Sequence, residues 1–304
     1  MPDELDMYLA KLSAKERDEL LAMLSRSRHE RREHPLDALL LAHDYIAPVI
    51  GHISPSARRL DKESLTKPLS IAGTPIELPK PAPLTIPLDA ALARRHSDRS
   101  RYPGSMQLST LSTVLFHAAS ARATYRGYGR NDLIFRRVAS AGGIESVELL
   151  VSIRDVDGID RGVYVYDARE HAFLQTPVRE PVTAIARACG QEIWMLEAPC
   201  VIFFVGRIRR LRWKYDSLAL RVLLQDVGNL QANLLLTSSA VDLTACISSG
   251  IDSDSLVEDF GLTPGEDLIL SSLVLGPPRS SATPEPGKAQ EQMPNTNSDQ
   301  GDGQ

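Results

Sequence analysis

The sequence lacks the features that mark nucleic-acid-binding, secreted and membrane proteins. Its 304 residues carry a formal net charge of −5 and a pI of about 5.8, so no positive field exists to attract nucleic acid. No apolar run approaches the roughly 18 residues that suggest a membrane span. Residues 1–32 also lack the apolar core of a signal peptide, because Asp, Glu, Lys and Arg dominate them. We therefore expect a cytoplasmic protein.

Cysteine is scarce, and metal-binding and dinucleotide motifs are missing. Cys189, Cys200 and Cys246 are widely separated, which fits reduced thiols in a core better than a disulfide framework or a CxxC metal site. The histidines form no HExxH motif and no cluster with cysteine, so no metal site is expected. The segment Gly127-Tyr128-Gly129 is not followed by the strand-turn-helix pattern of a dinucleotide fingerprint. We interpret it as a flexible lid or loop.

The hydrophobic pattern divides the chain into three parts. Residues 3–27 and 36–49 have apolar side chains at helical spacing and predict two amphipathic helices. Prolines crowd residues 50–87, which favours an extended arm that wraps over a surface. We expect N-terminal helices and this arm over residues 1–87, a folded domain over residues 88–276 and a disordered tail over residues 277–304.

The hydrophobic pattern predicts both helices and strands in the central domain. The expected helices cover residues 88–95, 108–121, 181–190, 218–240 and 253–260. The expected strands cover residues 147–154, 162–166, 200–206, 243–248 and 267–275. Ser109 is a plausible N-cap for the second of these helices. The helix over residues 218–240 is mostly apolar, so we expect it to be central and in contact with more than one neighbour.

Two clusters of residues favour a phosphorylated, planar cofactor. The first offers guanidinium groups around a hydroxyl, which suits a terminal phosphate, and consists of Arg95, Ser97 and Arg99. The second consists of small residues whose backbone can approach a flat ring closely, namely Ser140, Ala141 and Gly142. Together they predict a site for flavin mononucleotide, FMN.

Four segments in a fixed order carry a family resemblance. The first is an RRSxR-like stretch at residues 94–99, and the second is a PSAGGLYPLE-like loop at residues 139–148 with a GxYxYD segment at residues 162–167. The third is the pair Lys214-Tyr215, which opens a long helix. The fourth is an EAGHLAQNL-like stretch at residues 226–234 that leads into an IGGFDDD-like loop at residues 248–254. This order resembles the SagB-type, or McbC-like, flavin dehydrogenases. That family is a branch of the nitroreductase fold and oxidises azoline rings to azoles in ribosomally made, modified peptides.

The resemblance, which runs from about residue 36 to residue 276, implies a fold and partners. The expected fold is of the α+β class, a nitroreductase-like mixed sheet flanked by helices, in a homodimer that holds each FMN between its subunits. A peptide substrate and a complex with a cyclodehydratase are implied as well. The sequence departs from the family at Ala139, Glu145 and Ser146, which stand where the family has Pro, Tyr and Pro and which alter the wall near the flavin.

The resemblance also assigns roles to single residues. Ser249 and Gly250 belong to the loop whose backbone N–H points to flavin N5. Asn233 either binds the ribityl chain or caps a buried polar network, and Asn229 has the same alternatives. Arg279 matches a basic residue that completes the phosphate clamp, or else is a charge of the tail.

Lys214 and Tyr215 are the expected catalytic residues. Oxidising an azoline removes a proton from one ring carbon and transfers a hydride to flavin N5. Because the proton comes from carbon, its removal needs a positioned base. That base is either a lysine whose pKa burial has lowered or a tyrosine made anionic by the lysine. The leading function is FMN-dependent oxidation of peptide azolines. The alternatives are an NAD(P)H-dependent reductase of dehydroalanine or another activated alkene, and a non-catalytic FMN-binding scaffold subunit.

Overall fold

The computed structural model of the protein describes residues 69, 71, 73–99, 104–189, 192–215 and 218–278. The helices expected over residues 3–27 and 36–49, almost all of the expected tail and Arg279 lie outside the described residues. Among the described helices, none is long and apolar enough to cross a membrane.

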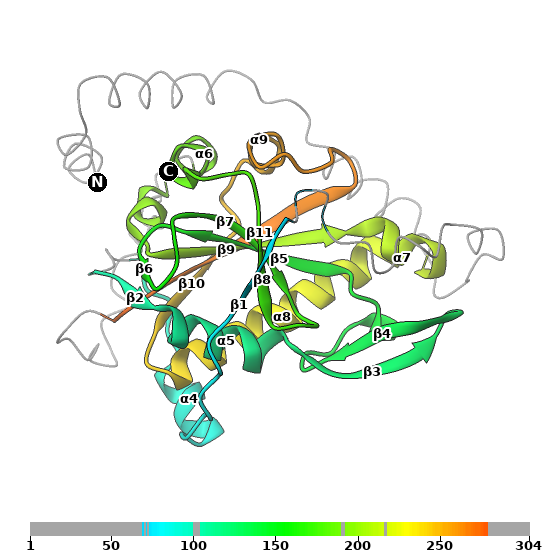
Figure 1. Ribbon diagram of the computed structural model, residues 1–304, viewed down its shortest axis with the longest axis horizontal. Coiled ribbons are helices and arrows are strands. Elements are labelled where there is room, and N and C mark those ends of the chain that lie inside the picture. Colours follow the sequence, from blue (N-terminus) through cyan, green and yellow to red (C-terminus); the bar gives the residue numbers. More distant parts are fainter. Residues whose placement is uncertain are drawn as a thin grey trace, which may run out of the picture.

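A seven-stranded antiparallel sheet forms the centre of the fold (Figure 1). In spatial order its strands are β1 (Pro75–Glu77), β8 (Ala172–Gln175), β7 (Gly162–Asp167), β5 (Val147–Ile153), β9 (Cys200–Arg207), β11 (Asp267–Gly276) and β10 (Thr244–Ser248). The expected α+β, nitroreductase-like class is confirmed, but the sheet is antiparallel rather than mixed. Most connections explain this, because they return the chain to the end of the sheet where it left, whereas the connection from β9 to β10 crosses to the opposite end and joins two strands separated by β11. Among the described residues, parallel pairing joins β2 (Met106–Gln107) to β6 (Val156–Asp157).

Both faces of this sheet are buried, and the strand sequences show it. In β5, Leu149 and Val151 face one hydrophobic core and Leu150 faces the other. In β9, Phe204 and Phe203 divide in the same way. Since successive side chains of a strand point to opposite faces, a strand covered on both sides is a continuous apolar run, as in β9.

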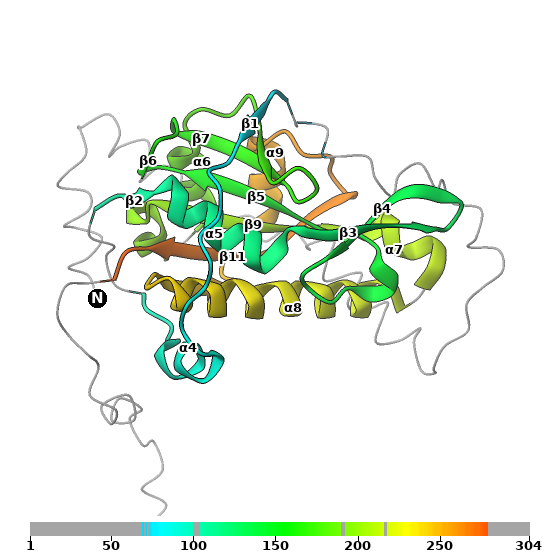
Figure 2. The same cartoon turned by 60° about the horizontal axis from the view of Figure 1, so that its bottom comes forward.

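Helices supply the two covering layers. The helices α5 (Leu108–Ala119) and α8 (Ala219–Ala240) pack on one face, and α6 (Pro181–Ala188), η4 (Ile193–Glu197) and α9 (Ser253–Asp259) pack on the other. Figure 2 shows α8 lying along the sheet, with α4 (Leu88–Arg94) on its far side. The hairpin of β3 (Ala121–Gly127) and β4 (Arg130–Arg136) lies beside one end of α8, together with α7 (Ile208–Tyr215).

The elements expected within residues 88–276 are present, with ends shifted by no more than two residues. Ser109 is not the N-cap of α5, because Gln107 takes that position without a capping side chain and the Ser109 carbonyl accepts a hydrogen bond from Thr113. The sequence analysis missed β1, β8, the β3–β4 hairpin and α7. The described part of the Pro-rich arm is extended and lies along α5, where Ala82 N donates to Thr113 Oγ1 at 3.0 Å.

Candidate functional site

The small-residue loop forms η3 (Ala141–Gly143), and a buried carboxylate fixes it. Asp226 on α8 is 5% exposed and accepts hydrogen bonds from Ala141 N at 2.9 Å and from Ser146 Oγ at 2.5 Å. Gly142 has a φ of +63°, a left-handed conformation that favours glycine. The departure at Ser146 therefore has a structural role, since a proline there would leave one oxygen of Asp226 without its donor.

Three polar side chains converge on the bare Cα of Gly142. A Cβ at this position would lie 2.8 Å from Tyr128 Oη and 2.9 Å from Tyr215 Oη, and it would also contact Lys214 Nζ. Tyr128 Oη donates to Gly142 O at 2.7 Å. The structure thus brings together Lys214, Tyr215 and the small-residue loop, and it adds Tyr128, which the sequence analysis did not assign to the site.

Lys214 binds Tyr128 and is a cation. Its Nζ donates to Tyr128 Oη at 2.5 Å and lies 4.7 Å from the centre of that ring and 5.2 Å from the ring of Tyr215. Burial alone lowers the pKa of Lys214, but hydrogen bonds to Tyr128 and Tyr215 and the electrostatic interactions with both tyrosines outweigh burial and raise it. The expectation that Lys214 is a base whose pKa burial has lowered is therefore wrong. The alternative, a tyrosine assisted by a lysine cation, agrees with the geometry.

The position of Lys214 and Tyr215 along the chain also differs from the expectation. The pair ends α7 instead of opening α8, which begins at Ala219. The last turn of α7 places both side chains beside η3 and the hairpin. The helix α7 was missed because its alternating arginines and apolar residues are too few for a clear helical period.

Tyr128 reaches this site from the tip of the β3–β4 hairpin. Gly127 pairs with Arg130, so Tyr128 and Gly129 form a two-residue turn, and both have positive φ angles, +53° and +78°. Such turns favour Asn-Gly or Asp-Gly, and a left-handed non-glycine residue costs about 1–2 kcal/mol. The signal that could have found this hairpin is a Tyr-Gly pair between two runs of strand-forming residues.

Buried charges anchor the segment that follows η3. Arg210 on α7 is 3% exposed, donates to Glu145 O and pairs with Glu148. Arg136 donates to Val147 O at 2.8 Å and pairs with Glu145 at 3.4 Å. Glu145, which replaces the tyrosine of the family, is therefore held by arginines and joins α7 to the small-residue loop.

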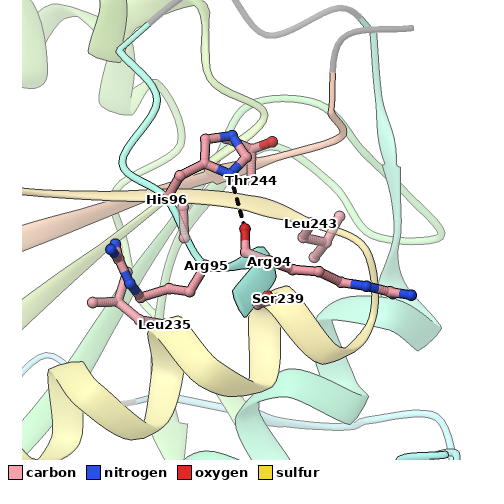
Figure 3. A pocket seen from close by; sticks show the side chains of 8 residues that line it. Arg94, Arg95, His96, Leu235, Ser239, Leu243 and Thr244 are labelled. Carbon is pink, nitrogen blue, oxygen red and sulfur yellow. Dashed lines mark hydrogen bonds between the residues drawn. The ribbon is translucent and has the colours of Figure 1, made fainter. Parts of the chain in front are cut away.

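The expected phosphate clamp lies elsewhere, in the exposed segment after α4. A cavity of about 20 Å³ adjoins it, lined by Arg94, Arg95, His96, Leu235, Ser239, Leu243, Thr244 and Ala245. Figure 3 shows the guanidinium groups of Arg94 and Arg95 pointing in opposite directions. Burial raises the pKa of Cys246, while the charge of Arg99 and a hydrogen bond from Ser97 lower it in part, which places both residues beside β10. The clamp residues thus gather around one strand.

Ser249 and Gly250 directly follow the same strand. The Gly250 N–H donates to Ser248 Oγ at 3.1 Å, and a Cβ at Gly250 would lie 3.0 Å from Glu192 Oε1. Glu192 Oε2 is buried and lacks a hydrogen-bond partner among the described residues. It is an acceptor available to the hydroxyl or N–H group of a ligand. The described residues contain no cluster of His, Cys, Asp and Glu able to hold a metal ion.

Within one chain, the phosphate-clamp residues and the small-residue loop lie on opposite sides of α8. Asp226 contacts the small-residue loop and Leu235 lines the clamp cavity. These residues are nine positions apart, which is about two and a half turns, so they point in opposite directions about 14 Å apart along the axis. The amide of Asn233 donates to Ala118 O at 3.3 Å, which agrees with the expected alternative of an internal polar contact.

The face of α8 between the clamp residues and the small-residue loop is exposed, and it is called the open face below. Its exposed residues are Arg221, Leu224, Gln225, Gly228, Asn229 and Ala232. A Cβ at Gly228 would have no atom within 4 Å, and Leu224 is 44% exposed. The helix expected to be mostly apolar therefore has one buried face and one face of small, polar and isolated apolar residues.

Asp226 makes stability depend on pH. Burial raises the pKa of Asp226 above its usual 3.8, and hydrogen bonds from Ser146 and Ala141 offset part of this. The folded state therefore holds the proton more tightly than the unfolded chain, so the free energy of unfolding falls as pH rises from 3.8 through the raised pKa. We expect Asp226→Asn to remove this fall. Urea denaturation of both proteins at several pH values measures it, and a difference between them that is independent of pH would contradict the prediction.

Comparison with known proteins identifies the family. The model of the nitroreductase family matches residues 92–276, more than half of the chain. The putative nitroreductase MJ1384 of Methanocaldococcus jannaschii is 27% identical over 183 residues, which cover 60% of this chain and 88% of that protein. The trifolitoxin-processing protein TfxB of Rhizobium leguminosarum bv. trifolii is 23% identical over 238 residues, which cover 72% of this chain and 64% of that protein.

A solved structure shares the fold. It is a chain of the E. coli microcin synthetase McbBCD complex with truncated pro-MccB17 bound, with a TM-score of 0.52, 13% identity and coverage of 83% of this chain and 100% of that chain. At this identity the likeness shows the fold alone. The family match and the antiparallel sheet with its long helix agree, so the chain belongs to the nitroreductase family of oxidoreductases, and its cofactor is FMN.

Proposed function

We propose that this protein is a SagB-type dehydrogenase that oxidises azoline rings in a ribosomally made peptide, with FMN as the hydride acceptor. The observation that carries this proposal is the convergence of the Lys214 ammonium and two tyrosine hydroxyls on the bare Cα of Gly142. A proton acceptor held beside a cation is what the removal of a ring C–H requires. The relatives support the substrate class, because TfxB processes trifolitoxin and the microcin synthetase holds a peptide.

The described residues fit FMN. Arg95 and Arg99 are exposed cations beside a hydroxyl, which suits a dianionic phosphate. The strand β10 leads from this clamp to Ser249 and Gly250, where the free oxygen of Glu192 would accept a hydrogen bond from the cofactor. The clamp cavity of about 20 Å³ is too small for a flavin, so the clamp alone accounts only for the phosphate end.

The residues of the chain divide the chemistry between binding and proton transfer. Bound FMN supplies the acceptor for a hydride from the ring. The lack of a side chain at Gly142 lets the Lys214 ammonium and the two tyrosine hydroxyls gather against the backbone of the small-residue loop. Lys214 remains charged and stabilises negative charge on the hydroxyl oxygen that takes the proton from the neighbouring ring carbon.

We further propose that a second copy of the chain completes the site. In a homodimer built on the open face of α8, the clamp of one subunit meets the small-residue loop of the other, which one chain alone keeps on opposite sides of the helix. Gly228 and Ala232 lie one turn apart on this face and permit close approach of a second helix. The exposed Leu88 and Leu92 of α4 extend the apolar surface beside it.

Leu224→Glu is expected to give a monomer that purifies without flavin, because a charge would be buried at the centre of the proposed interface. Light scattering measures the mass, and absorbance measures the flavin. Glu258→Lys is the control, since Glu258 is exposed on α9, on the other face of the sheet. A Leu224→Glu protein that stays dimeric with full flavin content would place the interface elsewhere.

The proposed function is tested with a peptide that carries an azoline. We expect the purified holoprotein to convert it to the azole, seen by mass spectrometry as the loss of two hydrogens. A protein that instead adds two hydrogens to dehydroalanine at the expense of NAD(P)H is a reductase. A protein that does neither, but raises the yield of a cyclodehydratase, is a scaffold. Either result would refute the proposal.

A further inference from the structure

We propose that an extended segment of the peptide substrate pairs with the edge of β3 that faces away from β4, the outer edge, and that Arg122 and Arg126 bind acidic residues of this segment. The bound segment adds a third strand to the β3–β4 hairpin. This inference rests on the proposed function. It deepens that function by naming where the peptide lies and which side chains it carries.

The outer edge of β3 is accessible. Among the described residues, β3 pairs with β4 alone, in a hairpin that is separate from the seven-stranded sheet. Figure 1 shows this hairpin projecting from one end of the domain, with β3 along its outer margin. Four of the seven residues of β3 are exposed. An edge strand carries backbone N–H and C=O groups without a strand partner, and an extended peptide can pair with them.

The same strand leads to the candidate site. It ends one residue before Tyr128, whose hydroxyl donates to Gly142 O at 2.7 Å. Tyr125, within β3, donates to Gly143 O at 3.0 Å. Seven residues of strand span about 20 Å, so a peptide paired with β3 runs along the hairpin to the small-residue loop. Its ring can then reach the expected catalytic residues while its neighbours remain on the strand.

Arg122 and Arg126 are the exposed cations of β3. In the part of the chain that the structure describes, neither forms an ion pair. Asp132 is the one acidic residue among positions 121–137, and Arg130 binds it at 2.6 Å. The hairpin therefore has positive charge that its own carboxylate does not neutralise. A carboxylate of a bound peptide is complementary, because a guanidinium group can bind it with two parallel hydrogen bonds.

Arginines on an edge strand also have a protective role, since they prevent identical strands from pairing. Two copies of β3 would bring four of these cations together, and like charges on adjacent strands are unfavourable. An acidic peptide gains attraction at the same positions. The two arginines thus exclude a second copy of the hairpin and favour an acidic chain, so protection and recognition have the same cause.

Binding is tested by fluorescence anisotropy with a labelled nine-residue peptide that carries aspartate at every second position and no azoline. We expect it to bind the full-length holoprotein at low salt, and its asparagine counterpart to bind about tenfold more weakly. Arg122→Gln/Arg126→Gln should weaken binding of the aspartate peptide about tenfold and leave the asparagine peptide unchanged. In 1 M salt these differences should shrink, because salt screens exposed charges.

Arg161→Gln/Arg179→Gln is the matched control for the loss of two charges. Both of these arginines are exposed, one directly before β7 and the other after β8, and neither lies on the hairpin. We expect this variant to bind the aspartate peptide as the wild type does. Equal affinity for the two peptides, or an equal loss in both double variants, would overturn the proposal.

Strand pairing is tested separately with the aspartate peptide methylated at all of its central backbone nitrogens. Methylation removes the N–H donors that pair with a strand and keeps every carboxylate. We expect at least about tenfold weaker binding to the unaltered protein. Equal binding of the methylated and unmethylated peptides would show that the contact is made by charge alone and would overturn docking on the outer edge.

These measurements separate the inference from the proposed function, because they need no turnover. A protein that binds the aspartate peptide in this way but leaves azolines unchanged refutes the function alone. If azolines are oxidised, a ring flanked by aspartates should show a KM raised about tenfold in Arg122→Gln/Arg126→Gln, with kcat unchanged. An unchanged KM would refute the inference and leave the function standing.

Discussion

Lys214→Ala is expected to lower azoline oxidation by at least about a hundredfold while the protein keeps its flavin. The ammonium binds the Tyr128 hydroxyl at 2.5 Å and is not one of the clamp residues, so its loss removes a cation beside the tyrosine hydroxyls and leaves the phosphate end intact. Azole formation, followed as the loss of two hydrogens, and flavin absorbance measure the two effects separately. Tyr215→Phe tests the remaining member of the expected catalytic pair in the same assays.

Arg212→Ala is the control for this variant. Arg212 is an exposed cation on the same helix, α7, and its replacement removes one positive charge without touching the tyrosines. We expect it to retain turnover. If Lys214→Ala loses flavin in parallel with activity, the lysine has a structural role. If it keeps both, the proton is handled by other residues.

The double variant Arg95→Ala/Arg99→Ala is expected to purify without colour. Both side chains are exposed near β10, where two guanidinium groups are suited to bind a phosphate that carries close to two negative charges. The loss of both contacts should remove FMN during purification, and the absorbance spectrum after gel filtration measures it. Thermal stability of the protein without added FMN should stay near that of the wild-type apoprotein, since both residues are exposed.

Arg94→Ala is the matched control, because Arg94 adjoins Arg95 but its guanidinium points the other way (Figure 3). We expect this variant to keep its flavin. A double variant that is as yellow as the wild type would show that Arg95 and Arg99 do not hold the phosphate. Loss of flavin in Arg94→Ala would extend the clamp to that residue.

Local sequence predicted most of the central domain. The strand β9 is a continuous apolar run that a sheet buried on both faces requires, and its ends were found to within one residue. The helix α8 was found in the same way, because 22 residues provide several turns of a consistent period. Short or polar helices and strands were not predicted. The strand β3 has arginines and bulges that break its alternation, and β1 has only three residues.

The site was predicted in its parts but not in its assembly. Gly142 and Lys214, both predicted site residues, lie beside each other in the structure, whereas Tyr128 was interpreted as part of a loop. The pKa of Lys214 had the opposite direction to one of the two expectations, because burial was considered and the tyrosine partners were unknown. The phosphate clamp and the residues after β10 stay predictions, since no bound cofactor tests them.

The sequence by itself determined the nitroreductase family, the α+β class and the positions of the main strands and helices. These follow from side-chain periods and motif order, which are local properties of the chain. Only the tertiary structure decided that Tyr128 meets Lys214, 86 residues away, and that Asp226 fixes a loop 85 residues before it. It also decided that the clamp and the small-residue loop lie on opposite sides of α8. Such contacts depend on how the helix, hairpin and sheet pack together, and no local pattern encodes that packing.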